Sequence, residues 1–287
     1  MPELPEVHAL ASDLDARLRG RVIDRLQLVA FPALKSYDPP VEALAGETVA
    51  GVARHGKFLD IETEGELHLV MHLARAGWVR WRAGEPKSSG RPGSGPLAAR
   101  LVLDDGSGFD VTEAGTKKSL AIHVVRDPSE VAGIARLGPD PLTEDFTLAR
   151  FRAILAAQGR AQLKGVLRDQ SVIAGIGNAY SDEILHVARM SPYKPAAMGD
   201  DDSAVLYEAL RTTLADAVAR GEGVAASELK AEKKSSLRVH GRFGEPCPVC
   251  GDRIQQVIFA DRTFQYCPTC QTGGKKLSDR VLDRLLR

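Results

Sequence analysis

The chain has 287 residues, enough for two or three domains, and its hydrophobic content of 44% is ordinary for a globular protein. Its 38 basic residues balance 38 acidic ones, and no apolar run approaches the roughly 20 residues of a membrane span. Composition therefore argues against a membrane protein. The start of the chain also lacks a basic segment followed by an apolar core, which predicts a cytoplasmic protein without a secretory signal.

The first 17 residues predict a helix. Pro5 is suited to a first helical turn, and four aliphatic side chains recur at helical spacing: Val7, Leu10, Leu14 and Leu18. The chain begins with MPELPEV, which has a proline at position 2 and acids at positions 3 and 6. Because chain ends are usually frayed and chemically idle, this stretch taken alone predicts a disordered start.

Strands are expected next. In LHLVMHL four large apolar side chains alternate with His68, Val70 and His72, the period-2 pattern of a half-buried strand. The alternation places both histidines on the face opposite the large apolar side chains. RLVLDDGSGFDVT predicts a hairpin that turns at Asp105 and Gly106.

The composition becomes rich in Pro, Asp and Gly around residues 127–146, which indicates an interdomain linker. The patterns from 147 to 220 are helical, with four candidate helices at 151–158, 161–170, 178–190 and 203–221. Gly175 and Gly177 separate the second from the third, and Asn178 can cap the third. Glycines before a helix N-terminus expose N–H groups suited to phosphate, although an ordinary turn between helices has the same pattern.

The C-terminal quarter is basic. Residues 226–287 contain 12 Lys and Arg against 7 Asp and Glu, a net charge of +5. This excess indicates either a local anionic partner or a solvated basic face. Two short strands are expected within 238–270, and an amphipathic helix is expected at 277–287.

Four cysteines, the only ones in the chain, lie in this region: Cys247, Cys250, Cys267 and Cys270. Their spacing, C-x2-C-x16-C-x2-C, is typical of a tetrahedral site for one structural zinc ion held by thiolates. Disulfides are rare in a cytoplasmic protein, so redox-active pairs are the remaining alternative.

Taken together, four stretches resemble in order the motifs of the formamidopyrimidine-DNA glycosylase / endonuclease VIII family: MPELPEV, RHGKFL, DQSVIAGIGNAYSDE and GRFGEPCPVCG with YCPTCQ. The resemblance implies an α+β multidomain fold, with an N-terminal two-layer β-sandwich and flanking helices, a helix–two-turn–helix domain and a C-terminal β-hairpin zinc finger. The expected parts are a catalytic domain at 1–130, a linker at 131–146, the DNA-binding helices at 147–225, and the finger with a helical tail at 226–287.

The resemblance gives MPELPEV a chemical role. Members of this family excise oxidised bases and cut the abasic strand by β,δ-elimination. Removal of Met1 would leave Pro2 with a free secondary amine, whose pKa near 8 leaves a useful fraction unprotonated at neutral pH. Such an amine can form a Schiff base with the damaged nucleoside. By the family match, Glu3 is the acid/base on the sugar, and Glu6 occupies a further active-site position.

Five further residues are expected to bind DNA. Lys57 in RHGKFL matches a family lysine that binds phosphate beside the lesion, although an exposed lysine at the start of a strand would look the same. Asn178 matches the phosphate-contacting residue of the two-turn–helix element. Lys164, just upstream, has a weaker correspondence. Arg262 matches the arginine of the zinc hairpin that reaches the phosphates around the flipped nucleotide, and His72 completes the set.

The chain departs from the family in three places. HLARAG places Arg75 where the family has a methionine that fills the void left by the flipped base. The stretch GTKKSL offers Lys117 and Lys118, with no aromatic side chain, where the family has an arginine and an aromatic wedge. The segment between Gly223 and Leu237 is several residues shorter than the family's oxoguanine-capping loop. Lesion recognition is therefore left open.

Three functions are compatible with these observations to different degrees. The first is a bifunctional DNA glycosylase/AP lyase of base excision repair, a monomer acting on duplex DNA with damaged bases or abasic sites, in the cytoplasm with the nucleoid. The second is a relative that binds damaged or abasic DNA with weak or no base excision. The third, a zinc-ribbon protein bound to RNA or a transcription complex, does not account for Pro2, Glu3 and Lys57 at the family's spacing.

Overall fold

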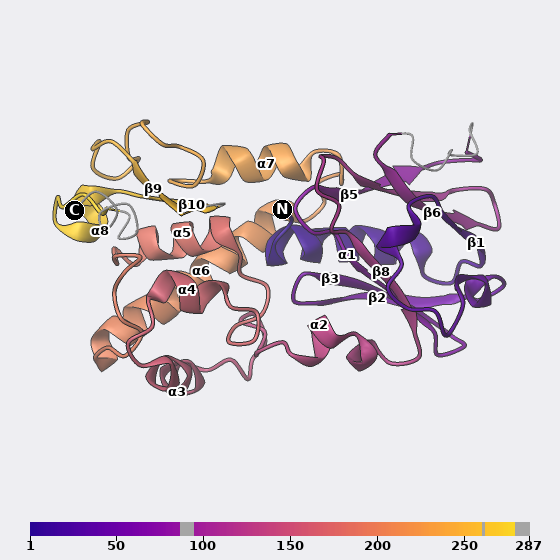
Figure 1. Cartoon of the computed structure of the whole chain (residues 1–287), viewed down its shortest axis with the longest axis horizontal. Helices are drawn as coiled ribbons and strands as arrows, with labels where there is room; N and C mark the ends of the chain where they lie inside the picture. Colours follow the sequence, from indigo (N-terminus) through magenta and orange to yellow (C-terminus); the bar gives the residue numbers. More distant parts are fainter. Residues whose placement is uncertain (87–94, 260–261, 279–287) are drawn as a thin grey trace. The chain divides into compact units, whose positions relative to one another are not determined.

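The computed structural model of the protein describes residues 1–86, 95–259 and 262–278 (Figure 1). Two compact units make up the chain. The N-terminal unit contains residues 1–137 and 220–229, and the C-terminal unit contains residues 138–219 and 230–287. The N-terminal unit therefore includes a short segment at the end of a 22-residue helix and just after it.

The N-terminal unit is the predicted two-layer β-sandwich (Figure 1). One four-stranded antiparallel sheet has the order β1 (Ile23–Leu28), β6 (Leu97–Leu103), β7 (Gly108–Glu113) and β5 (Gly77–Arg82). The other has the order β2 (Val49–His55), β3 (Phe58–Thr63), β4 (His68–His72) and β8 (Ala121–Val125). Two short helical turns, η1 (Phe31–Ala33) and η2 (Val41–Leu44), lie between β1 and β2, and η3 (Pro128–Glu130) and α2 (Ala132–Ala135) follow β8.

Helix α1 (Leu4–Leu18) covers the sandwich core with the face that the sequence predicts. All four side chains of its apolar stripe are buried in one cluster with residues of both sheets. In β4, Leu69 and Met71 belong to this cluster, whereas Val70 packs on the opposite face with Val125 and Val131. The predicted alternation of this strand is therefore confirmed, as is the β6–β7 hairpin, in which Gly106 adopts a φ of 79°.

The segment that follows α6 (Asp200–Gly221) is tied to this core. The indole N–H of Trp78 donates to the carbonyl oxygen of Ala226 at 2.8 Å. Val224 and Ala226 pack against the main cluster, and Leu229 is buried in it. Val224, Ala226 and Leu229 therefore anchor this segment to the N-terminal core.

The C-terminal unit contains most of the remaining helices and the small sheet. The four predicted helices are present as α3 (Leu148–Gln158), α4 (Leu163–Arg168), α5 (Asn178–Val187) and α6. A helix that the sequence did not predict, α7 (Leu229–Ser236), follows, and the finger consists of β9 (Gln255–Phe259), β10 (Arg262–Tyr266) and α8 (Pro268–Thr272). Most of the predicted tail helix falls on residues 279–287, outside the described residues. Among the helices of the described ranges, none is long and apolar enough to cross a membrane.

The predicted linker, 131–146, contains α2 and then a run of turns. The boundary between the compact units falls inside it, after Leu137. The finer division of the chain into four parts stays a prediction.

Candidate active site and metal centre

Pro2, Glu3 and Glu6 meet at the start of α1, where all three are buried. Glu3 is the N-cap residue of the helix, and its backbone N–H donates to Oε2 of Glu6 at 2.8 Å. Only 2% of Glu3 and 4% of Glu6 are exposed. Carboxylates are seldom buried to this degree unless they are paired with other groups. Glu6 therefore fixes the backbone that carries Pro2 and Glu3, a role that the helical spacing alone did not reveal.

Lys57 lies in the turn between β2 and β3, and His72 ends β4, the strand that pairs with β3. Lys57 precedes β3 and is 7% exposed, and the β3–β4 register pairs its neighbour Phe58 with His72. The rings of Phe58 and His72 have centroids 4.7 Å apart. Burial, together with the positive charges of Lys57 and His123, lowers the pKa of His72 to about 4. At neutral pH His72 is therefore an uncharged hydrogen-bonding group rather than a cation.

The two loops that depart from the family pattern are neighbours. The N–H of Ala114 donates to the carbonyl oxygen of Ala76 at 3.2 Å, which joins the turn carrying Arg75 to the loop after β7. That loop is closed by the buried carboxylate of Glu113, whose Oε1 accepts the N–H groups of Ser119 at 2.7 Å and Leu120 at 3.0 Å. Three basic side chains on these loops are exposed: Arg75, Lys117 and Lys118.

Asn178 is the first residue of α5, and Gly177 is its N-cap residue. The prediction that the Asn178 side chain caps this helix is therefore wrong. Its Nδ2 donates instead to the carbonyl oxygen of Thr263 in β10, at 2.7 Å. An amide NH2 group carries two donors, so this bond occupies one of them. The contact positions the strand that begins at Arg262 against the start of α5.

Lys164 is only 5% exposed, and its ammonium group donates within the protein. The acceptors are the carbonyl oxygen of Asn178 at 2.8 Å, Oγ of Ser181 at 2.7 Å and Oδ1 of Asp182 at 2.6 Å. An ammonium group has three donors, so a phosphate contact requires that one of these bonds be exchanged. The contacts assign Lys164 to holding α4 against α5, and its direct role at DNA stays a prediction.

Two acids of α5 hold the finger to the helix, and sequence reasoning did not single them out. Asp182, fully buried, accepts from Nδ1 of His240 at 2.6 Å and from the N–H of Gln265 at 3.2 Å. Glu183 accepts the consecutive N–H groups of residues 238, 239 and 240 at 2.7, 3.0 and 2.8 Å. Burial raises the pKa of Glu183, and these three bonds oppose that shift. The sequence feature that could have singled them out is a pair of adjacent acids in the middle of a helix whose neighbouring residues are buried.

Arg262 opens β10, where its backbone pairs with Phe259. The side chains of these two residues lie outside the part of the chain that the structure describes. The phosphate contact expected of Arg262 therefore stays a prediction.

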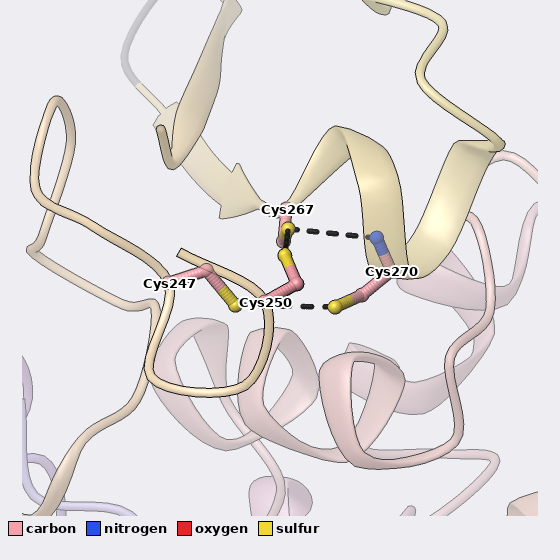
Figure 2. A group of neighbouring side chains, drawn as sticks. All are labelled: Cys247, Cys250, Cys267 and Cys270. Atoms are coloured by element: carbon pink, nitrogen blue, oxygen red, sulfur yellow. Dashed lines mark hydrogen bonds between the residues drawn. The ribbon is translucent and has the colours of Figure 1, made fainter. Parts of the chain in front are cut away.

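The four cysteines converge, as Figure 2 shows, with every pair of sulfurs within 4.8 Å. None of the four forms a disulfide; Sγ of Cys250 is 3.3 Å from Sγ of Cys267, and Sγ of Cys247 is 3.9 Å from Sγ of Cys270. Tetrahedral zinc with Zn–S bonds of about 2.3 Å requires sulfurs about 3.8 Å apart, so the set fits this ion. Burial raises the pKa of Cys267, and that of Cys270 to about 11, so a cation is needed to hold them as thiolates.

Three family matches cover most of the chain in the predicted order. Residues 1–117 match the formamidopyrimidine-DNA glycosylase N-terminal domain, and residues 137–228 match the H2TH domain of the same enzymes. Residues 244–273 match the zinc finger found in FPG and IleRS. Together with the sulfur geometry, this match assigns one structural zinc ion to the four cysteines.

Curated relatives and solved structures agree with these matches. The formamidopyrimidine-DNA glycosylase of Heliobacterium modesticaldum is 34% identical over 280 residues, which cover 94% of this chain and 100% of the relative. A formamidopyrimidine-DNA glycosylase-like protein of Mycobacterium tuberculosis is 54% identical over 155 residues, which cover 53% of this chain and 94% of that protein. The crystal structure of MutM (Fpg) from Thermus thermophilus has a TM-score of 0.80 at 31% identity, covering 96% of this chain and 100% of that one.

A β-sandwich, an H2TH helical region and a four-cysteine finger in this order define a DNA-repair glycosylase. The chain belongs to the formamidopyrimidine-DNA glycosylase family, also called Fpg or MutM. The predicted fold class and the predicted zinc ion are thereby confirmed.

Proposed function

We propose that the chain is a bifunctional DNA glycosylase/AP lyase that excises damaged bases and cuts abasic sites through a Schiff base on Pro2. The observation that carries the proposal is the start of α1, where Pro2 and two buried carboxylates lie together and Glu6 holds the backbone N–H of Glu3. Buried acids next to a potential nucleophile are typical of an active site rather than of a frayed terminus.

The reaction begins once Met1 has been removed, because only then is the nitrogen of Pro2 an amine. Its lone pair attacks C1′ of the damaged nucleoside, the C1′–base bond breaks, and the base leaves with a proton. Glu3 supplies a proton to the ring oxygen as the sugar opens, which leaves a cationic iminium between Pro2 and C1′. The iminium withdraws electrons from C2′, so loss of a C2′ proton expels the 3′ phosphate. A second elimination expels the 5′ phosphate.

DNA would be held through its backbone. Lys57 and Arg262 are the proposed cationic phosphate contacts, and Asn178 and the uncharged His72 are the proposed neutral ones. Solved structures of relatives support DNA with an abasic site or a damaged base as the partner. A Lactococcus lactis Fpg bound to DNA with an abasic site has a TM-score of 0.81 at 26% identity and covers 94% of this chain and 99% of that one. MutM in complex with DNA that contains carbocyclic 8-oxo-G has a TM-score of 0.82 at 26% identity.

A second candidate is a protein that binds abasic or damaged DNA with little base excision. The observation that favours it is the pair of adjoining loops with Arg75, Lys117 and Lys118, which present cations where the family has a methionine and an aromatic wedge. Without such a wedge, extruding a stacked base is costly. For either candidate, the expected location is the cytoplasm, with the nucleoid.

Borohydride trapping distinguishes the two. Protein with a processed N-terminus is mixed with duplexes containing an abasic site, a ring-opened purine or 8-oxoguanine, and the reduced covalent adduct is measured. An adduct on abasic DNA supports the lyase, and adducts on the damaged bases support the glycosylase. Binding without an adduct on any duplex supports the second candidate. Pro2→Gly, which leaves a primary amine, and a variant with a blocked N-terminus are the controls.

A further inference from the structure

His186, in the last turn of α5, contacts a zinc ligand. Only 2% of the residue is exposed, and Nε2 of its ring lies 3.3 Å from Sγ of Cys247. A zinc-bound thiolate has no proton and can only accept a hydrogen bond, so the hydrogen in this contact must reside on Nε2. The geometry thus requires one tautomer of His186.

The rest of the ring has little polar contact to account for its burial. Among the described residues, Nδ1 of His186 has no hydrogen-bond partner. Buried polar atoms are rarely left unpaired, and an acceptor is tolerated better than a donor. A ring protonated on Nε2 leaves an acceptor at Nδ1, which agrees with the tautomer that the sulfur contact requires. Among the described residues, the imidazole of His186 therefore makes its polar contact through Nε2, to Sγ of Cys247.

Hydrogen-bond donors stabilise the negative charge of a four-thiolate zinc centre. A zinc ion with four thiolates carries a formal charge of about −2, and Cys247 and Cys267 are almost completely buried. Sγ of Cys267 accepts the backbone N–H of Cys270 at 3.5 Å, whereas Sγ of Cys247 faces the imidazole. N–H donors withdraw charge from thiolates and orient them, as partners of metal ligands generally do.

We propose that His186 is a positioning residue of the zinc centre: its Nε2–H group donates to the Cys247 thiolate, holds that ligand in place and slows its release of zinc. Because α5 begins at Asn178 and ends near His186, the same helix contacts β10 at one end and the metal centre at the other. The inference concerns the metal site and does not depend on which reaction the protein catalyses.

The test compares two variants of the full-length protein. His186→Phe keeps a ring but removes the donor, and His186→Gln places an amide N–H near the position of Nε2. Zinc affinity is measured by competition with a chelator, and the sulfur-to-metal charge-transfer band is recorded after cobalt substitution. We expect His186→Phe to lose about 10- to 100-fold in zinc affinity and to shift the band to longer wavelength. We expect His186→Gln to recover most of both.

His55→Phe is the matched control, because His55 bonds to Asp60 in the N-terminal unit and should leave zinc binding unchanged. The proposal fails if His186→Phe binds zinc as tightly as the unmodified chain. It also fails if His186→Gln is as weak as His186→Phe, since the ring shape would then be what matters. Should His186→Phe not fold, the cadmium-substituted unmodified protein decides. Nuclear magnetic resonance of its labelled imidazole should show a proton on Nε2 coupled to the metal, and a proton on Nδ1 alone overturns the proposal.

Discussion

The carboxylate of Glu6 accepts a hydrogen bond from the backbone N–H of Glu3. Glu6→Ala would leave the buried N–H of Glu3 without its acceptor, which costs about 1–3 kcal/mol of unfolding free energy. Glu6→Gln keeps an oxygen in place of the carboxylate oxygen and should retain most of the stability. Urea unfolding measures the first effect, and single-turnover cleavage of abasic DNA measures whether Pro2 is displaced. Equal losses in the two variants would show that the charge of Glu6, rather than its hydrogen bond, is what matters.

His72 gives the fold a pH dependence whose sign follows from its environment. Its pKa is lowered from 6.5 to about 4 in the folded protein, so between these values the unfolded chain binds more protons. The unfolding free energy should therefore fall as the pH falls, by about 2 kcal/mol between pH 7 and pH 5 from this residue. His72→Gln should flatten the dependence by that amount in urea unfolding at the two pH values. An unchanged difference between them would mean that His72 is hydrated and titrates normally.

At the scale of elements, the segment after α6 bears on which base is accepted. Val224, Ala226 and Leu229 pack into the N-terminal core, the indole N–H of Trp78 donates to the carbonyl oxygen of Ala226, and α7 begins at Leu229. We infer that little chain is left to fold over a flipped 8-oxoguanine. Because 8-oxoguanine resembles guanine closely, rejecting guanine needs polar contacts to the altered edge. Bases that pair and stack poorly cost less to extrude and need fewer such contacts.

The expected order of substrates is abasic sites first, ring-opened or saturated bases next, and 8-oxoguanine last. Single-turnover rates on duplexes of identical sequence provide the comparison. A clear preference for 8-oxoguanine opposite cytosine would contradict this account, because another segment would then have to supply the cap.

Most elements could be predicted from local patterns, and the exceptions have physical causes. The stripe of α1, the alternation of β4 and the four helices all express a buried face with a regular period, which a sequence displays directly. Helix α7 was missed because its sequence, LKAEKKSS, has a single buried apolar residue, Leu229, and no apolar stripe. The cap of α5 was misassigned by one residue, because the Asn178 side chain bonds to β10, which is distant in sequence.

The candidate site shows the same limit. Motif order and cysteine spacing predicted the zinc ligands, and the structure brings them together. The contacts of Lys164, of the acids Asp182 and Glu183, and of His186 join residues that are 14 to 83 positions apart along the chain. No local period encodes such pairs, so they become visible only in the folded chain.

At the scale of the whole molecule, the two units have separate cores, and zinc belongs to one of them. The finger has two small clusters of buried side chains among the described residues: Val239, Cys247, Ile254 and Cys267 in one, and Val257, Phe264 and Tyr266 in the other. Removing zinc should therefore loosen β9, β10 and α8 while the sandwich stays folded, because a structural zinc site supplies folding free energy directly. Hydrogen exchange before and after chelation measures this, with the sandwich strands as the internal reference. Equal loss of protection in both units, or in neither, would contradict the assignment.

The central claim is that the N-terminal amine carries the chemistry, and the position of the trapped adduct tests it most directly. The protein is reduced with borohydride on abasic DNA, digested, and mapped by mass spectrometry. The account predicts that the sugar remnant is attached to Pro2, in chains that have lost Met1. An adduct on Lys57 or another lysine, or efficient cleavage by chains that retain Met1, would contradict it.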